Sequence, residues 1–215
     1  MTRVAPSILS ADFANLGKEV AEVSQLGADF IHIDVMDGSF VPNITIGPGI
    51  IKAIRGYSNI PFITHLMIDR PEKLVNNFAS AGSDFITVHV EAKGDPGEAI
   101  KRVRQAGKKV GIAVNPPTQL KKAERFLPLV DLVLIMTVNP GWPGQKFIEE
   151  AAAKISEARA LIDEEELGTL IEVDGGINPE TGKICAQKGA DILVAGSAIF
   201  GSSDRKAVID ALKAL

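Results

Sequence analysis

Short apolar runs recur along the whole chain, and each is followed by a segment in which the apolar residues have helical spacing. Runs of this length, bounded by polar residues or glycine, predict buried strands. We therefore expect eight strands, at Val4–Leu9, Phe30–Val35, Phe62–Met67, Phe85–Val90, Val110–Val114, Leu132–Val138, Leu170–Val173 and Ile192–Ala195.

The segments between these runs carry signals of helices. Asp12 is a candidate N-cap, and Phe13, Leu16, Val20 and Val23 follow it at the spacing of one helix face. Prolines stand near three other expected helix starts, where a missing N–H costs little; they are Pro71, Pro96 and Pro179. The chain thus reads as a regular alternation of strands and helices.

A short sequence pattern recurs where an expected helix ends and the next strand begins. Residues 27–30, 82–85 and 189–192 share the pattern Gly-x-Asp followed by an apolar residue, and glycine tolerates the left-handed conformation of a helix C-terminus. Eight such units without a break in composition predict a single α/β domain over residues 1–215, a (β/α)8 TIM barrel. The alternative is an open doubly wound sheet. Its usual Gly-rich loop after the first strand is missing.

Composition narrows the class of protein. Net charge is −4, and dispersed lysines and arginines argue against a nucleic-acid partner. A single cysteine, Cys185, allows no internal disulfide, and we expect it to be buried and inert. No apolar run reaches the roughly 18 residues of a membrane span, and the first residues lack the apolar core of a signal peptide. We expect a cytoplasmic protein that does not bind membranes.

Polar residues stand near the ends of three runs, where (β/α)8 barrels carry their chemistry. His32 and Asp34 alternate with apolar residues and so share the face turned into the barrel; His65 and Asp174 end the third and seventh runs. Two carboxylates buried together need a cation or a proton between them. We predict one divalent metal ion held by these four residues. Nitrogen and oxygen donors suit Zn²⁺, Fe²⁺, Mn²⁺ or Co²⁺ alike.

Other polar and sulfur-containing side chains lie close to this set. His89 and Glu91 alternate in the same way on the fourth run, and we expect them to form hydrogen bonds around the site or in the core rather than to bind the metal. Asp37 precedes a glycine, and we expect it to have a turn or capping role. Three methionines near strand ends either fill the core or form an apolar lining over a substrate; they are Met36, Met67 and Met136.

Glycines follow the seventh and eighth runs. Gly175 and Gly176 come after Asp174, and Gly196 and Ser197 follow the last run, where a short extra helix is expected to begin. Glycine lets the backbone approach an anion, helix N-termini offer free N–H groups, and barrels often bind phosphate at these two loops. We therefore expect a small phosphorylated substrate. The loop of residues 139–145 either folds over this ligand or is a plain turn.

With these residues in place, the chain resembles the ribulose-phosphate 3-epimerases over essentially its whole length. The matching segments are residues 5–13, 32–38, 40–43, 65–67, 88–91, 136–141, 173–177 and 195–200. The resemblance implies a barrel of the ribulose-phosphate-binding type. It also implies interconversion of D-ribulose 5-phosphate and D-xylulose 5-phosphate, and assembly as a homo-oligomer.

The resemblance also implies individual roles. It implies His32, Asp34, His65 and Asp174 as metal ligands, Asp34 and Asp174 as the acid–base pair, and the methionines as a lining. It implies substrate contacts at Ser7, His65, Gly141, Trp142, Pro143, Gly144, Gly175, Gly176, Gly196 and Ser197. One departure concerns the sixth loop, which usually reads Pro-Gly-Phe-Gly-Gly-Gln in the family. Pro143 has no N–H to donate and a fixed φ, so we expect a less mobile loop here.

The implied reaction removes a weakly acidic C–H proton next to a ketone and passes through an enediolate. A metal ion would neutralise the negative charge of that intermediate. Inversion then needs proton carriers on both of its faces, which is the expected task of Asp34 and Asp174.

Three other functions compete with this one. Lyases on similar barrels carry Asp-x-Lys-x-x-Asp on an early strand, whereas residues 34–37 read Asp-Val-Met-Asp and contain no lysine. A sister epimerase would act on allulose 6-phosphate with the same chemistry, and pocket length would decide between the two. A non-catalytic phosphosugar-binding protein would not need an intact set of four metal ligands.

Overall fold

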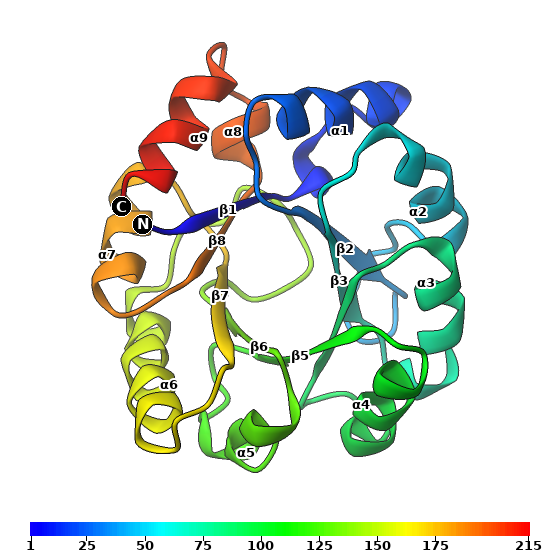
Figure 1. Ribbon diagram of the computed structural model, residues 1–215, viewed down its shortest axis with the longest axis vertical. Coiled ribbons are helices and arrows are strands. Elements are labelled where there is room, and N and C mark those ends of the chain that lie inside the picture. Colours follow the sequence, from blue (N-terminus) through cyan, green and yellow to red (C-terminus); the bar gives the residue numbers. More distant parts are fainter.

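Eight parallel strands form a ring at the centre of the computed structural model, which describes residues 1–215 (Figure 1). Their order around the ring is β1-β8-β7-β6-β5-β4-β3-β2, and a parallel bridge between Ser7 and His32 joins β1 to β2. The predicted (β/α)8 barrel is confirmed. The strands are β1 (Arg3–Pro6), β2 (Ile31–Met36), β3 (Phe62–Met67), β4 (Phe85–His89), β5 (Lys109–Val114), β6 (Leu132–Met136), β7 (Leu170–Asp174) and β8 (Ile192–Ala195).

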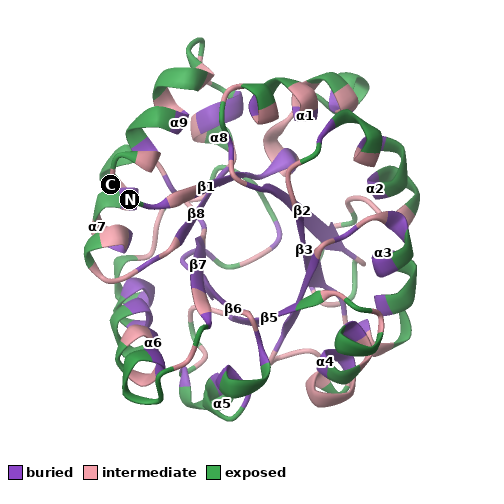
Figure 2. Cartoon of the chain, in the orientation of Figure 1, coloured by how far each residue is buried: buried purple, intermediate pink, exposed green.

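Helices surround this ring, and their outer faces are exposed (Figure 2). They are α1 (Leu16–Gln25), α2 (Pro48–Ile54), α3 (Val75–Ala81), α4 (Pro96–Gln105), α5 (Lys121–Glu124), α6 (Ala153–Glu164), α7 (Pro179–Gln187), α8 (Ser197–Phe200) and α9 (Arg205–Lys213). Short 3-10 helices lie at Ile8–Ser10, Phe13–Asn15, Arg55–Tyr57, Pro71–Lys73, Leu127–Leu129 and Glu149–Ala152. Pro71, Pro96 and Pro179 each begin a helix, as predicted.

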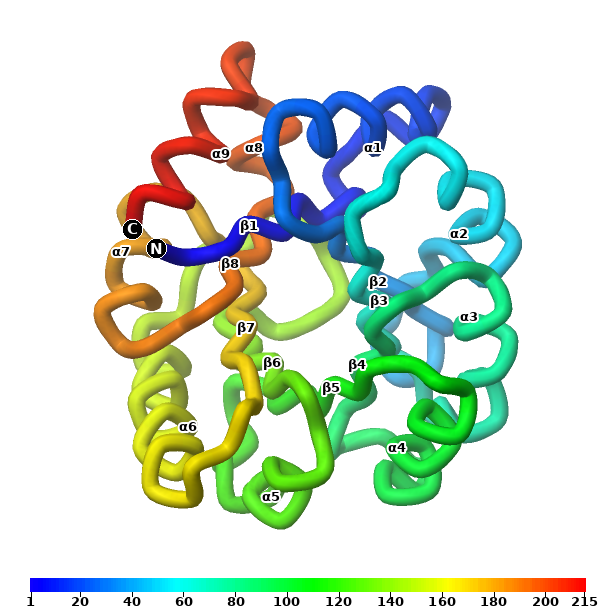
Figure 3. The backbone as a smooth tube through the Cα atoms, in the orientation of Figure 1, coloured from blue at the N-terminus to red at the C-terminus, as the bar shows by residue number.

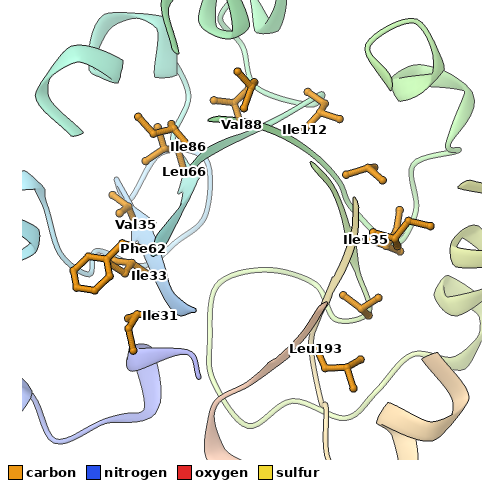
Figure 4. Packing of buried hydrophobic residues seen from close by; sticks show 14 of the residues in the cluster. Ile31, Ile33, Val35, Phe62, Leu66, Ile86, Val88, Ile112, Ile135 and Leu193 are labelled. Atoms are coloured by element: carbon orange, nitrogen blue, oxygen red, sulfur yellow. The ribbon is translucent and has the colours of Figure 1, made fainter. Parts of the chain in front are cut away.

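Alternation along each strand divides the apolar residues into two layers. Ile31, Ile33 and Val35 of β2 belong to the large cluster that packs between strands and helices (Figure 4). A smaller cluster, which includes Phe85 and Leu132, lies on the inward face of the ring. Phe30 and Phe85 meet there edge to face, with ring centroids 5.9 Å apart. The members of this cluster at the amino ends of the strands, such as Phe85 and Leu132, form an apolar plug. Inward positions at the carboxyl ends are left for polar residues as well.

Four aspartates repeat the same contact around the amino ends of the strands, which we call the base of the barrel. The backbone N–H of Asp191 donates to the carbonyl of Ile171 (2.8 Å), and its Oδ2 accepts from the N–H of Ile171 (2.8 Å). The same pair of hydrogen bonds joins Asp29 to Val4, Asp84 to Phe62 and Asp131 to Val110. Each of these carboxylates also pairs with a lysine or arginine. The base therefore contains four copies of one arrangement, which we call the strand-end lock. In each copy an aspartate is hydrogen-bonded, through its backbone N–H and its carboxylate, to a residue near the start of the preceding strand.

Three of these locks follow the Gly-x-Asp pattern of the sequence. Their glycines, Gly27, Gly82 and Gly189, have φ values of 99°, 112° and 102°, in the predicted left-handed region. The fourth lock, at Asp131, has no glycine two residues earlier. The repeated Gly-x-Asp pattern of the sequence therefore coincides with three of the four strand-end locks.

Three predicted boundaries move by two residues or more, and several others move by one residue. β1 ends at Pro6 rather than Leu9, because the Ser7 side chain accepts from the N–H of Leu9 and begins a 3-10 turn. β6 ends at Met136 rather than Val138. Helix α1 begins at Leu16, and Asp12 caps the preceding 3-10 turn, which leaves Phe13 half-exposed.

The two ends of the chain meet at the base (Figure 3). The hydroxyl of Thr2 donates to the carbonyl of Leu212 at 2.7 Å. Lys213 of α9 donates to the carbonyl of Gly27 and pairs with Asp29. None of the helices has the length and apolar character needed to cross a bilayer.

Candidate metal centre and active site

The carboxyl ends of β2, β3 and β7 bring four donor side chains together. His32, Asp34, His65 and Asp174 each offer one nitrogen or oxygen atom, and these atoms all lie within 4.8 Å of one another. His32 and His65 are fully buried and Asp34 nearly so. We call these four residues the donor cluster, and they are the residues that sequence analysis expected to converge.

Asp34 lies at the centre of the donor cluster. Its Oδ1 is 3.2 Å from His32 Nε2 and 3.0 Å from His65 Nδ1, and its Oδ2 accepts a hydrogen bond from Ser7 Oγ at 2.6 Å. The carboxylate of Asp174 accepts no hydrogen bond within the chain, and its closest cationic atom is His32 Nε2 at 3.9 Å. Asp34 is thus fixed by its neighbours, whereas Asp174 remains free to reach a ligand.

A third carboxylate, Glu172, was missed by sequence analysis. It is fully buried, and its Oε1 lies 3.0 Å from His32 Nδ1, while its Oε2 has no partner. The signal was present, because Glu172 alternates with Asp174 on β7 as His32 does with Asp34 on β2. A carboxylate on the far nitrogen of a ligating histidine orients the ring and raises its basicity.

His89 and Glu91 extend the hydrogen bonding from the other imidazole. His65 Nε2 lies 2.7 Å from His89 Nε2, and His89 Nδ1 lies 3.0 Å from Glu91 Oε2. Neither His89 nor Glu91 belongs to the donor cluster. The predicted hydrogen-bonding role is confirmed for both. Asp37 forms an antiparallel bridge with Ile44 directly after β2. Its side chain has the expected capping role, because it accepts from the N–H groups of Ser39, Phe40 and Asp69.

The two aspartates of the cluster have opposite electrostatic environments. Burial raises the pKa of Asp174 to about 8, and the nearby charge of Asp34 adds to the effect. Burial would also raise the pKa of Asp34, but His32 and His65 outweigh it and hold that pKa below its ordinary value. Burial would lower the pKa of His32, but Asp34 and Glu172 raise it well above its usual range. In the cation-free protein, one carboxylate stays ionised beside one that holds its proton.

The donor set fits a divalent cation. It offers two imidazole nitrogens and two carboxylate oxygens without thiolate, which is the chemistry of Zn²⁺, Fe²⁺, Mn²⁺ and Co²⁺ sites. The outer nitrogens of His32 and His65 are already engaged by Glu172 and His89. The inner nitrogens therefore face the other donors, as ligation requires.

A pocket opens above the donor cluster at the carboxyl ends of the strands, which we call the mouth of the barrel. Asp34 and Asp174 line it, whereas His32 and His65 lie buried below it. Met36, Met67 and Met136 line it too, so the methionines are both buried and at the pocket wall. The remaining lining residues include Ser7, Gly141, Trp142, Pro143, Gly144, Gly175, Gly176, Gly196 and Ser197.

The glycines of the last two loops present unpaired backbone groups at this pocket. The N–H groups of Gly175, Gly176 and Gly196 donate no hydrogen bond within the chain. A Cβ at Gly176, whose φ is 66°, would lie 2.7 Å from the backbone nitrogen of Phe147. Helix α8 begins at Ser197, as expected. These loops have both the free donors and the bare backbone that an anion needs.

The loop between β6 and α6 crosses the mouth, as the yellow-green segment of Figure 1 shows. Two side chains that sequence analysis had not assigned hold it. Gln145 Nε2 donates to the carbonyls of Asn139 (2.6 Å) and Trp142 (3.0 Å), and Asn43 Nδ2 donates to the carbonyl of Gly141 (2.7 Å). Trp142 remains largely exposed.

Comparison with known proteins agrees with this site. Residues 3–200 match the model of the Ribulose-phosphate 3 epimerase family. The chain is 50% identical over 214 residues to the ribulose-phosphate 3-epimerase of Bacillus subtilis strain 168, with 99% of both chains covered. It is 51% identical over 201 residues to the Synechocystis enzyme of the same name, covering 93% of this chain and 87% of that one.

Solved structures with low identity share the fold. A 3-keto-L-gulonate-6-phosphate decarboxylase from Vibrio cholerae superposes with a TM-score of 0.72 at 17% identity, covering 99% of this chain and 96% of that chain. This likeness concerns the barrel alone. The family model and the close relatives carry the assignment: the chain belongs to the ribulose-phosphate 3-epimerase family.

Proposed function

We propose that the protein interconverts D-ribulose 5-phosphate and D-xylulose 5-phosphate by proton transfer at C3, with a divalent metal ion at the donor cluster. The observation that carries the proposal is the convergence of His32, Asp34, His65 and Asp174 within 4.8 Å at the floor of the pocket. Family membership supplies the sugar phosphate as the substrate class.

The four residues of the donor cluster would hold the cation. When bound, such an ion supplies positive charge that neutralises developing charge on the ketone and hydroxyl oxygens of the substrate. Ser7 and His65 hold Asp34 from two sides, and Glu172 orients His32. These contacts fix the donors before the substrate arrives, so little reorganisation is needed during the reaction.

Asp34 and Asp174 are the proposed acid–base pair. They come from β2 and β7, on different parts of the ring, and this placement supports a scheme in which they act on opposite faces of a flat enediolate. Their environments separate their pKa values, which leaves one carboxylate to accept a proton and one carboxylic acid to donate. The two roles exchange in the reverse reaction.

The rest of the pocket suits the remainder of the substrate. The free N–H groups of Gly175, Gly176 and Gly196 are the proposed phosphate donors. Met36, Met67 and Met136 offer soft apolar surface above the donor cluster, and they exclude water from the reacting carbons. The loop that contains Trp142 and Pro143 is the proposed cover.

The test is an assay of ribulose 5-phosphate epimerisation, joined to solvent deuterium uptake at C3 and elemental analysis. Wild type should epimerise, incorporate deuterium at C3, lose activity after chelation and regain it when metal is returned. Asp34→Asn and Asp174→Asn should each reduce epimerisation by at least about 1,000-fold, because inversion needs both proton carriers.

Asp163→Asn is the matched control, because this aspartate is exposed on α6; it should leave the rate unchanged. Full activity in either active-site variant, at normal metal content, would refute the scheme of two carboxylates. Assaying D-allulose 6-phosphate alongside D-ribulose 5-phosphate decides whether the preferred substrate has five or six carbons. A higher kcat/KM for the six-carbon sugar would overturn the substrate assignment.

A further inference from the structure

A line of hydrogen bonds leads from the donor cluster to the backbone of the loop after β5. His65 Nε2 lies 2.7 Å from His89 Nε2, and His89 Nδ1 lies 3.0 Å from Glu91 Oε2. The other carboxylate oxygen, Glu91 Oε1, accepts from the backbone N–H of Asn115 at 2.9 Å. Both imidazoles in this line are fully buried.

The direction of these bonds is set at the Asn115 end. A backbone N–H is always a donor, so Glu91 Oε1 must accept. The carboxylate of Glu91 then accepts on its other oxygen too, which requires a proton on His89 Nδ1. In a neutral ring, that proton leaves His89 Nε2 as an acceptor, and His65 Nε2 must then carry the donated proton. His65 Nδ1 is then left with its lone pair, as ligation of a cation requires. Without the cation, its 3.0 Å contact with the ionised Asp34 needs the other tautomer, so the assignment is made for the cation-loaded protein.

We propose that Glu91 and His89 are positioning residues that select the tautomer of His65, so that its Nδ1 lone pair faces the metal. This inference rests on the proposed metal site. Glu91 forms no hydrogen bond with the donor cluster, so its proposed role is exerted through His89. Glu172 acts on His32 directly, whereas Glu91 acts on His65 through an intervening imidazole.

The substitution Glu91→Gln separates this role from packing, because an amide has the shape of a carboxylate but only one acceptor. If its oxygen faces the N–H of Asn115, its NH₂ group faces His89 Nδ1 and forces the proton of His89 onto Nε2. When His65 Nδ1 holds the cation, that proton opposes the one on His65 Nε2. If the amide is turned around, its NH₂ group opposes the N–H of Asn115 instead. Either arrangement leaves two donors facing each other.

The experiment measures zinc affinity and histidine tautomers. Competition with a chromophoric chelator should show that Glu91→Gln binds Zn²⁺ about 10- to 100-fold more weakly than wild type. The chain has only three histidines, His32, His65 and His89, so long-range ¹⁵N–¹H spectra of the zinc-loaded protein resolve each ring. Wild type should show the proton on Nδ1 of His89 and on Nε2 of His65.

Asp84→Asn is the matched control. It changes a carboxylate to an amide at the other end of β4, where Asp84 also accepts a backbone N–H. Its zinc affinity should equal that of wild type even if its stability falls. The proposal is overturned if wild type carries the His89 proton on Nε2, or if Glu91→Gln binds zinc within threefold of wild type. Neither readout uses the sugar phosphate, so failure of the proposed reaction would show separately, as absent turnover in zinc-loaded wild type.

Discussion

At the scale of single residues, identical side chains acquire different properties from their neighbours. Asp34 is surrounded by three hydrogen-bond partners and stays ionised, whereas Asp174 has none within the chain and holds its proton. The aspartates at the base of the barrel accept backbone N–H groups and serve the fold. The environment of each carboxylate therefore decides whether it suits the proposed chemistry or stabilises the structure.

Asp174 gives the metal-free protein a pH-dependent stability. Its pKa is raised from 3.8 to about 8 in the folded state, so its contribution to stability is full below pH 3.8 and is lost as the pH rises towards 8. We expect the free energy of unfolding of metal-free wild type to fall across this range, relative to Asp174→Asn. Urea denaturation at several pH values measures the difference, and added Zn²⁺ should reverse the loss. A constant difference at all pH values would contradict the raised pKa.

The convergence of the donor cluster was predictable because strand alternation places polar residues on one face. The sequence alone could not show which second residue touches each histidine. Glu172 has the same alternation as Asp174, but its contact with His32 crosses the interior of the barrel. Contacts between side chains of distant strands depend on how the sheet curves into a ring, and the pattern of apolar and polar residues along one strand does not contain this information.

At the scale of elements, strand positions followed the apolar runs, and errors arose where side chains redirect the backbone. Ser7 was expected within a strand, but its hydroxyl accepts from Leu9 and donates to Asp34. Thr137 was also expected within a strand, but its hydroxyl donates to the carbonyls of Asp174 and Gly175. Both residues tie the first turn after a strand to the donor cluster or its neighbour.

The strand-end locks at the base should contribute stability without affecting catalysis. Asp191→Ala removes the acceptor of the Ile171 N–H and of Arg159, and it should lower the free energy of unfolding by about 1.5–3 kcal/mol. Urea denaturation measures the loss, and kcat/KM should not change.

Asp163→Ala is the control for that substitution, because Asp163 pairs with the same Arg159 from an exposed position on α6. A surface pair of this kind contributes less than about 1 kcal/mol. Equal losses in the two variants would show that the bond to the strand end contributes nothing.

Pro143 restricts the backbone of the loop at residues 139–145, which is the proposed cover of the pocket. Pro143→Gly adds conformational freedom that must be lost when the loop closes, and it should raise KM about two- to fivefold with little change in kcat. Steady-state kinetics and hydrogen exchange of residues 139–145 test this. Pro128→Gly, in the 3-10 helix after α5, is the control and should leave KM unchanged. An unaltered KM and exchange rate in the loop variant would contradict a stiffening role.

At the scale of the whole molecule, the barrel separates stability from chemistry along its axis. The apolar plug and the four aspartate locks lie towards the amino ends of the strands, and the donor cluster and pocket lie at their carboxyl ends. This polarity is general for such barrels. Polar residues at the carboxyl ends of the apolar runs were therefore sufficient to predict from the sequence that the four donors converge.

The pairing of β1 with β8 also constrains how the protein folds during its synthesis. On one side, β1 is joined to β2 by the bridge from Ser7 to His32 and by the hydrogen bonds between Val4 and Asp29. On the other side, the whole strand is in register with β8, where Arg3 pairs with Ile192. During synthesis the first strand thus leaves the ribosome about 190 residues before the strand that completes its pairing, a delay of roughly 10 to 40 s at ordinary elongation rates. The nascent chain therefore cannot close its ring until β8 has emerged, and ribosome-bound intermediates should expose the β8-facing edge of β1 to chaperones until that moment.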